Sequence, residues 1–180
     1  MATIDSNNPA TLMRQLLEAV ATKDLDTMGT MSHDDVVDDF VALGKFEGKD
    51  AVAAFFSELF TAVPDMQFTI NRIVGGDDRV AVGEWSITGT FSGGPFQGLE
   101  PTGRHVELRG VDVMEFDEGR LCRNTIYYDG LRFARQVGML PAEGSAADRA
   151  MRSSFNTVTR ARKGLRQTID RIKERSAQDS

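Results

Sequence analysis

The sequence predicts an α+β domain in which helices pack on one face of a strongly curved, mostly antiparallel sheet. Two observations predict this class. Helical periodicity dominates the first third of the 180 residues, and four long runs with strand signals follow it. Because the helices come first and the hairpin-linked strands after, the helices are expected to cover one face of the sheet that those strands build.

The first third of the chain predicts three helices and one strand. Residues 7–28 predict a helix, because Pro9 suits a first helical turn and apolar residues recur behind it at helical spacing. The last five of these residues suggest a short second helix. Residues 34–43 predict a strand, residues 44–48 a turn, and residues 49–63 a third helix with a wide apolar face.

Four strands and a short helix are expected next. The strand signals cover residues 66–75, 79–93, 104–117 and 120–129, with turn residues between them. Residues 130–140 predict a short helix that closes the domain. No internal repeat is visible in the sequence.

Composition and charge divide the chain into three parts. We predict a domain over residues 1–141, a small polar linker over residues 142–150 and a basic amphipathic helix over residues 151–178. Residues 1–148 carry 12 Lys and Arg against 24 Asp and Glu, while residues 149–175 carry 9 against 2. The domain is therefore acidic and the tail is basic.

The tail has an a/d pattern that lasts about three heptads. Arg162 fills its one polar position, and its apolar positions are Met151, Phe155, Val158, Leu165, Ile169 and Ile172. The favoured interpretation is a helix that folds onto its own acidic domain or pairs with a second copy, so we expect a homodimer. The alternative is contact with a membrane surface or nucleic acid, and the lack of aromatic residues among the basic positions weakens the nucleic-acid case.

Composition argues against several kinds of protein. No basic start followed by an apolar run marks a secretory signal, and no stretch approaches the roughly 20 apolar residues that span a bilayer. The single Cys122 cannot form an intramolecular disulfide, which fits a reducing cytoplasm. His33 and His105 are the only histidines, so we expect no zinc site and no other metal.

Two segments carry a resemblance to a known family. They are GTFSGGPFQGLEPTGRHVELRG at residues 89–110 and YYDGLRFARQVGMLP at residues 127–141. These strings resemble the SnoaL-like polyketide cyclase and ester cyclase group of the NTF2-like superfamily. Phe91 stands where that group usually has histidine, and Val137 where it usually has leucine. The resemblance covers roughly residues 8–141 and implies a cone-shaped fold with an apolar interior pocket.

A second resemblance is to ketosteroid isomerase, another branch of that superfamily. GVDVMEFDEGRL at residues 110–121 is similar to the isomerase strand that carries its proton-donating aspartate, which corresponds to Asp112. VDDFVALGKFEG at residues 37–48 is similar to the segment that carries its general base, which corresponds to Asp39. Both resemblances imply that pocket side chains move protons without a cofactor.

Both catalytic sets are incomplete in this chain. The isomerase tyrosine on the first helix corresponds to Leu16, so half of that oxyanion hole is missing. The cyclase acid corresponds to Ile126, and a nearby catalytic histidine to Asn124. Tyr128 shares a strand face with these two positions, and its hydroxyl is a candidate replacement for the missing tyrosine.

Asp112 is the strongest catalytic candidate. Strand alternation places it on one face with apolar or glycine residues at every other position of 106–116. Burial there raises a carboxyl pKa, and a neutral carboxyl can donate a hydrogen bond to an enolate, as the isomerase resemblance implies. The alternative is a structural ion pair with Arg109 or Arg123.

Asp39 is the candidate general base. In a strand Asp39 shares a face with Val37, and Asp38 shares the other with Val36, so only one of the two carboxylates can point inward. A partly buried carboxylate suits proton abstraction beside a carbonyl. Which face is inward stays open, and the alternative is an acidic, solvated strand edge.

Three other polar residues have simpler explanations. Asp129 precedes a short helix and is expected to cap it. His105 alternates with the face of Asp112 and is expected to be exposed. His33 is expected in a loop before the acidic strand.

The favoured function is a cofactor-independent isomerase or cyclase that acts on a small hydrophobic carbonyl compound. In it Asp39 abstracts a proton, while neutral Asp112 stabilises the enolate together with Tyr128. The alternative is a non-catalytic module that binds a hydrophobic ligand or a partner protein. The candidate ligand contacts are Leu16, Phe56, Trp85, Asn124 and Ile126.

Overall fold

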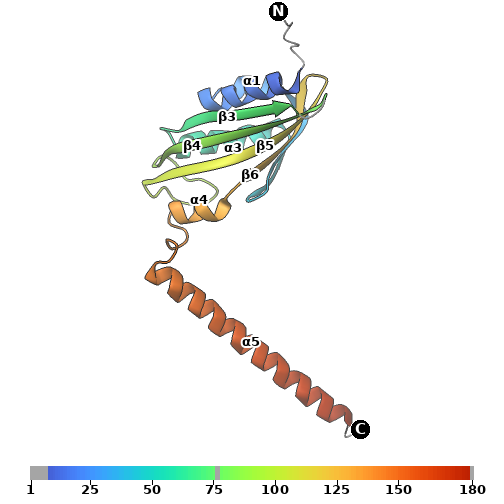
Figure 1. Ribbon diagram of the computed structural model, residues 1–180, viewed down its shortest axis with the longest axis vertical. Coiled ribbons are helices and arrows are strands. Elements are labelled where there is room, and N and C mark those ends of the chain that lie inside the picture. The colour runs from blue at the N-terminus through green and yellow to red at the C-terminus, as the bar shows by residue number, and fades with distance from the viewer. Residues whose placement is uncertain (1–7, 76–77, 179–180) are drawn as a thin grey trace, which may run out of the picture. The chain divides into compact units, whose positions relative to one another are not determined.

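The computed structural model describes residues 8–75 and 78–178, with side chains of the last helix described as far as residue 167 (Figure 1). The predicted α+β class is confirmed. In chain order the elements are α1 (Pro9–Thr22), α2 (Leu25–Thr30), β1 (Ser32–Phe40), β2 (Gly44–Glu47), α3 (Lys49–Ala62), β3 (Gln67–Gly75), β4 (Val80–Phe91), β5 (Arg104–Asp117), β6 (Arg120–Tyr128), α4 (Gly130–Gln136) and α5 (Ala146–Gln178).

The strands form one mixed sheet that curls without closing (Figure 1). Its order is β2-β1-β6-β5-β4-β3. The pairing of β1 with β6 is parallel, and every other neighbouring pair is antiparallel. The parallel pair joins segments from opposite ends of the domain sequence, because α3 and four further strands lie between them in the chain. This pairing brings residues of β1 close to residues of β5.

Helices α1 and α3 bury apolar faces against the sheet. Leu16 and Leu17 of α1 pack in a core that also includes Met114 of β5, while Phe55 and Phe56 of α3 pack in a second core. Helix α1 begins where the Asn8 side chain accepts a hydrogen bond from the backbone N–H of Ala10 at 3.0 Å. The apolar cores therefore lie between the helices and the sheet.

Burial along β5 confirms the predicted alternation. All six alternate residues from Val106 to Phe116 are buried, and Asp112 is among them. His105 faces the other way and is exposed, as expected. The helix cap is confirmed too, because the Asp129 side chain accepts a hydrogen bond from the backbone N–H of Arg132 at 2.9 Å.

One predicted element differs from the structure. Residues 44–48, expected to form a turn, contain the edge strand β2, which pairs with β1 so that Val37 lies opposite Glu47 and Phe40 opposite Gly44. This strand is only four residues long and mostly exposed, so its sequence lacks the alternation that identifies a strand.

The C-terminal part of the chain, residues 140–180, is a separate compact unit built on α5. The helix begins at Ala146, inside the segment expected to be a linker, because the Ser145 hydroxyl accepts a hydrogen bond from the backbone N–H of Asp148 at 3.1 Å. The side chains of Ile169 and Ile172 lie outside the described residues. In the described chain, no helix has the length and apolar character that crossing a membrane requires.

Candidate functional site

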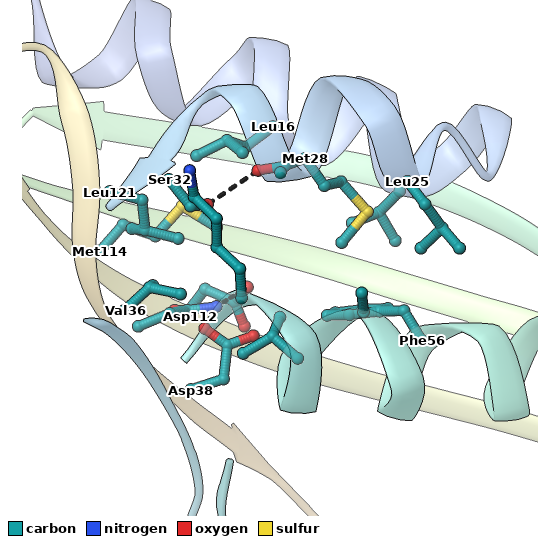
Figure 2. A pocket seen from close by; sticks show the side chains of 16 residues that line it. Leu16, Leu25, Met28, Ser32, Val36, Asp38, Phe56, Asp112, Met114 and Leu121 are labelled. Carbon is teal, nitrogen blue, oxygen red and sulfur yellow. Dashed lines mark hydrogen bonds between the residues drawn. The ribbon is translucent and has the colours of Figure 1, made fainter. Parts of the chain in front are cut away.

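A cavity of about 50 Å³ lies between α1, α2, α3 and the concave side of the sheet. Its walls are mostly apolar, and a few polar groups interrupt them. Because about 10–15 Å³ is enough to admit one water, this space is large enough to be hydrated. The lining residues labelled in Figure 2 are Leu16, Leu25, Met28, Ser32, Val36, Asp38, Phe56, Asp112, Met114 and Leu121.

Asp38 is the carboxyl that β1 turns into this cavity. It alternates with Val36 and Phe40, and all three side chains are buried. Only 2% of Asp38 is exposed, and its Oδ1 atom has no hydrogen-bond partner. Burial, and secondly repulsion by Asp112, raises the pKa of Asp38 to about 8. This carboxyl is therefore mostly protonated at neutral pH.

Asp112 approaches the same cavity from β5, in a different hydrogen-bonding environment (Figure 2). Trp85 donates its indole N–H to Oδ1 at 2.8 Å, and Asn124 donates its amide N–H to Oδ2 at 3.1 Å. Burial raises the pKa of Asp112 to about 6, and the two hydrogen bonds oppose that rise because they favour the charged form. The hydrogen bonds therefore favour the ionised form of Asp112, against the effect of burial.

Strand β6 brings the two aspartates together. Asn124 on β6 lies opposite Asp38 in the parallel pairing with β1, and opposite Met114 in the antiparallel pairing with β5. Its amide thus lies between the two carboxyl-bearing strands. The Asn124 Oδ1 atom is buried without a hydrogen-bond partner. Two buried polar atoms, the Oδ1 of Asn124 and the Oδ1 of Asp38, are consequently left for a ligand to satisfy.

A glycine in β5 allows the contact between Trp85 and Asp112. Gly110 lies opposite Trp85 in the sheet, two residues before Asp112. A Cβ atom at Gly110 would stand 2.2 Å from Trp85 Cζ2, so the indole ring occupies the space where any other side chain would lie. Only glycine at this position lets the ring cross β5 and reach the carboxyl.

A second cavity of about 70 Å³ lies beside Trp85 and has apolar and aromatic walls. Trp85 links the two sites, because its ring lines this cavity while its N–H binds Asp112. Tyr128 also lines it, and burial raises the pKa of its hydroxyl to about 12. The remaining lining residues are Phe40, Leu43, Phe55, Leu59, Ile87, Phe96, Leu108 and Phe133.

The structure corrects the predicted choice between the two acidic neighbours. Asp39 points to the opposite face of β1, where its carboxylate lies 3.1 Å from Arg123 and 3.7 Å from Lys45. Because strand side chains alternate, burying Val36 and Phe40 turns Asp38 inward and Asp39 outward. The ion pair considered for Asp112 is also wrong, since Arg123 binds Asp39 and Arg109 binds Glu84 at 2.7 Å.

The remaining predicted contacts are divided between the two cavities. Leu16 and Phe56 line the first, together with Asn124, while Trp85 and Tyr128 line the second. Tyr128 therefore does not line the cavity that contains the two aspartates, although it was predicted to stabilise the enolate there. Ile126 is 3% exposed and packs in the core, and it lines neither cavity.

Sequence reasoning missed two polar residues of the cavity and the glycine beside it. Lys49 lines the first cavity at the start of α3, with its Nζ 2.8 Å from the Asp34 carboxylate. Ser32 also lines it, and its hydroxyl donates to the Met28 carbonyl at 2.8 Å (Figure 2). Gly110 was placed on the face of Asp112 but given no role, although a glycine inside a strand signals a close approach by another group.

His33 and possible metal ligands were the other polar features that the sequence raised. His33 lies inside β1 and not in the expected loop, and its Nε2 is 2.8 Å from the backbone carbonyl oxygen of Asp117. Among residues 8–75 and 78–178, no group of three or more His, Cys, Asp or Glu side chains is placed to hold a metal ion.

Comparisons with known proteins agree with this architecture. A protein-family model described as SnoaL-like polyketide cyclase matches residues 10–137. A solved structure of a candidate SnoaL-like polyketide cyclase from Jannaschia sp. CCS1 is 19% identical with a TM-score of 0.67, and the match covers 78% of this chain and 98% of that one. No curated protein matches the sequence.

Two solved structures from Streptomyces give similar values. AclR, a candidate hydroxylase from Streptomyces galilaeus, is 18% identical with a TM-score of 0.66, over 88% of this chain and 98% of that one. IdmH, a candidate polyketide cyclase from Streptomyces antibioticus, is 22% identical with a TM-score of 0.60, over 72% and 98%. At such identities the likeness to these structures shows a shared fold.

Proposed function

The chain belongs to the SnoaL-like polyketide cyclase family, and we propose that it is a proton-transfer enzyme, an isomerase or cyclase, acting on a small hydrophobic carbonyl compound. The observation that carries this proposal is the pair of buried carboxyls in one apolar cavity. Asp38 and Asp112 have different hydrogen-bonding surroundings, and these push their pKa values to about 8 and about 6. Carboxyl pairs separated in this way suit one acid and one base.

The hydrogen bonds support Asp112 as the base and Asp38 as the acid. Asp112 accepts two hydrogen bonds, which stabilise its anion and orient it, and each of its oxygens keeps a lone pair for a substrate proton. Asp38 has no such donors at Oδ1, so its neutral form is favoured and can donate to a carbonyl oxygen. These roles are the reverse of those that the sequence suggested for the two strands.

The proposed step begins when the Asp112 carboxylate removes a proton from the carbon beside a substrate carbonyl. The electron pair of the broken C–H bond forms a C=C bond, and the carbonyl π electrons move to its oxygen. Protonated Asp38 donates a hydrogen bond to that oxygen, which stabilises the developing enolate. The enolate then takes the proton back from Asp112 at another carbon, which gives an isomer. Alternatively, it attacks a second carbonyl of the same molecule, which closes a ring, and the resulting alkoxide takes the proton from Asp112.

The walls of the cavity support a hydrophobic substrate that carries more than one oxygen. The unpaired Asn124 Oδ1 can accept a hydrogen bond from a hydroxyl or enol of the substrate, while Asp38 donates to a carbonyl. The cavity is small at about 50 Å³, yet Met28 and Met114 line it, and methionine side chains adapt easily to a ligand. We expect the substrate to widen this space on binding.

The experiment that tests the proposal follows hydrogen–deuterium exchange next to a carbonyl. The probe is 2-tetralone in deuterated buffer, observed by proton NMR. We expect the protein to accelerate exchange, and we expect Asp112→Asn and Asp38→Asn each to reduce the acceleration by about 100-fold or more, the range typical of acid–base catalysis. Asp39→Asn is the matched control, because this neighbouring carboxylate faces outward, and it should leave the rate unchanged.

A second measurement separates catalysis from ligand binding alone. The planar enol analogue 2-naphthol can be titrated by fluorescence against the protein and the same three variants. Binding of 2-naphthol that depends on Asp38, without any acceleration of exchange, would favour the non-catalytic binding module. Exchange that survives in both Asp112→Asn and Asp38→Asn would contradict the proposed mechanism.

A further inference from the structure

Helix α5 carries an apolar stripe along one side. The stripe consists of Met151, Phe155, Val158 and Leu165, whose exposed fractions are 41%, 70%, 50% and 64%. These residues follow one another at spacings of four, three and seven, so they lie along one side of the helix. Figure 1 shows α5 as one continuous helix. A stripe of this size on a long helix indicates a surface that something else covers.

The charges along the stripe are mostly positive, and the acid just before it, Asp148, is paired with Arg152 at 3.1 Å. Residues 149–169 contain six Lys and Arg and no Asp or Glu. Arg162 lies within the line of the stripe, and Lys163 and Arg166 flank it; all three are exposed. The surface that covers the stripe must therefore combine an apolar layer with negative charge close to it.

A second copy of α5 does not meet this requirement. In a coiled coil built on the stripe, the positions next to the seam include Arg152, Thr159 and Arg166 on one side, and Ser154 and Ala161 on the other. None of these residues is acidic, so neither a parallel nor an antiparallel pair would form ion pairs between the helices. Arg162 would also meet its own copy at the seam of a parallel pair.

Nucleic acid does not meet it either. Phosphates would satisfy the basic residues, but a duplex offers no apolar layer for Phe155 and Leu165. No aromatic residue is placed among the basic positions of residues 156–175 to stack on bases. An anionic bilayer has both parts, since its acyl chains lie a few ångströms beneath a layer of negatively charged headgroups.

We propose that α5 binds the surface of an anionic lipid bilayer, with its apolar stripe between the headgroups and its basic residues against the lipid phosphates. The helix lies parallel to the membrane plane. Arg162 reaches outward from the stripe, because a long side chain can bury its methylene groups and keep its guanidinium at the headgroups. This interaction is independent of the chemistry in the domain cavity.

The test is co-sedimentation of the full chain with sucrose-loaded vesicles. One set contains phosphatidylcholine alone, and the other contains phosphatidylcholine with about one-third phosphatidylglycerol. We expect at least about tenfold tighter binding to the anionic set, with most of that difference lost in high salt because salt screens the basic residues. Equal binding to both sets, or binding to neither, would overturn the proposal.

Point variants test the orientation of the helix. Phe155→Asp places a charge in the stripe and should weaken binding to anionic vesicles about tenfold or more. Ser153→Asp adds the same charge to an exposed position on the other side of the helix and should retain most of the binding. If the two variants lose binding equally, charge alone explains the interaction, and the proposed insertion is wrong. Far-UV circular dichroism verifies that both variants keep their helix.

Two further measurements test the other partners considered for the stripe, a second copy of the chain and an acidic polymer. The mass of the protein in solution is measured for the wild type and Phe155→Asp. A dimer that this variant dissociates, without vesicle binding by the wild type, would assign the stripe to a second copy. Binding to polyglutamate or duplex DNA in place of vesicles would assign the helix to an acidic polymer, and either result refutes the membrane proposal.

Discussion

Replacing Asp38 by asparagine should stabilise the protein at neutral pH while it removes the proposed acid. Asn is nearly isosteric with the protonated carboxyl, so the packing around position 38 is retained. The Asp38 pKa is raised by burial from its ordinary 3.8 to about 8. Between these two values the folded state holds a proton that the unfolded state releases, so the stability of the wild type falls as pH rises.

The size of the effect follows from the same two values. Each pH unit above 3.8 costs the folded wild type about 1.4 kcal/mol, which gives a ceiling of about 4 kcal/mol at pH 7. Below pH 3.8 the folded and unfolded states both hold the proton, so the loss of stability vanishes. Above a pH of about 8 both states have released it, so the loss stops growing. Asp38→Asn should therefore gain roughly 2 to 4 kcal/mol at pH 7 and little at pH 4.

Urea unfolding measured at several pH values between 4 and 8 tests this reasoning. The wild type should lose stability across the range, and Asp38→Asn should give a flatter profile. Asp39→Asn is the control: its ion pairs with Arg123 and Lys45 are at the surface, so it should change stability by less than about 1 kcal/mol and keep the wild-type profile. Parallel profiles for the wild type and Asp38→Asn would refute the claim that a protonated carboxyl is buried at this position.

Three other predictions concern the support of Asp112. Trp85→Phe removes the hydrogen bond to Oδ1, so the pKa of Asp112 should rise further above its ordinary value and the exchange of 2-tetralone should need a higher pH; an unchanged pH–rate profile would count against the assigned base. Gly110→Ala places a methyl group 2.2 Å from Trp85 Cζ2, so it should lower the free energy of unfolding by about 1 to 3 kcal/mol and alter the tryptophan fluorescence. Calorimetry that finds no loss of stability would contradict the packing of Trp85 over Gly110. Tyr128→Phe should leave the exchange rate within about twofold, because Tyr128 lines the second cavity; a large loss would restore its predicted catalytic role.

Strand alternation made much of the site predictable. The pattern of residues 106–116 placed Asp112 on a buried face before any contact was known, and the burial along β5 confirms it. The same rule limited the acidic strand to one inward carboxylate. It could not decide between Asp38 and Asp39, because valine flanks the pair on both faces and alternation has no preferred direction without a partner surface.

Hydrogen bonds inside the cavity were beyond local sequence reasoning. Trp85 and Asp112 are 27 residues apart, and their contact depends on the register of β4 against β5 and on the missing side chain of Gly110. For the same reason the sequence showed only part of what sets the pKa of Asp112: burial was visible in the pattern, but the two donors that oppose its effect were not.

The sequence by itself determined the α+β class, most of the helices and strands, the buried face of β5 and the basic, apolar-striped tail. Each of these depends on periodicity or on caps, which act over a few residues. Tertiary structure alone decided that β1 pairs with β6 in parallel, that Asp38 is the inward acid, and that Asn124 lies between the two carboxyl-bearing strands. Pairing between distant strands is selected by the burial of the whole core, which no local pattern contains.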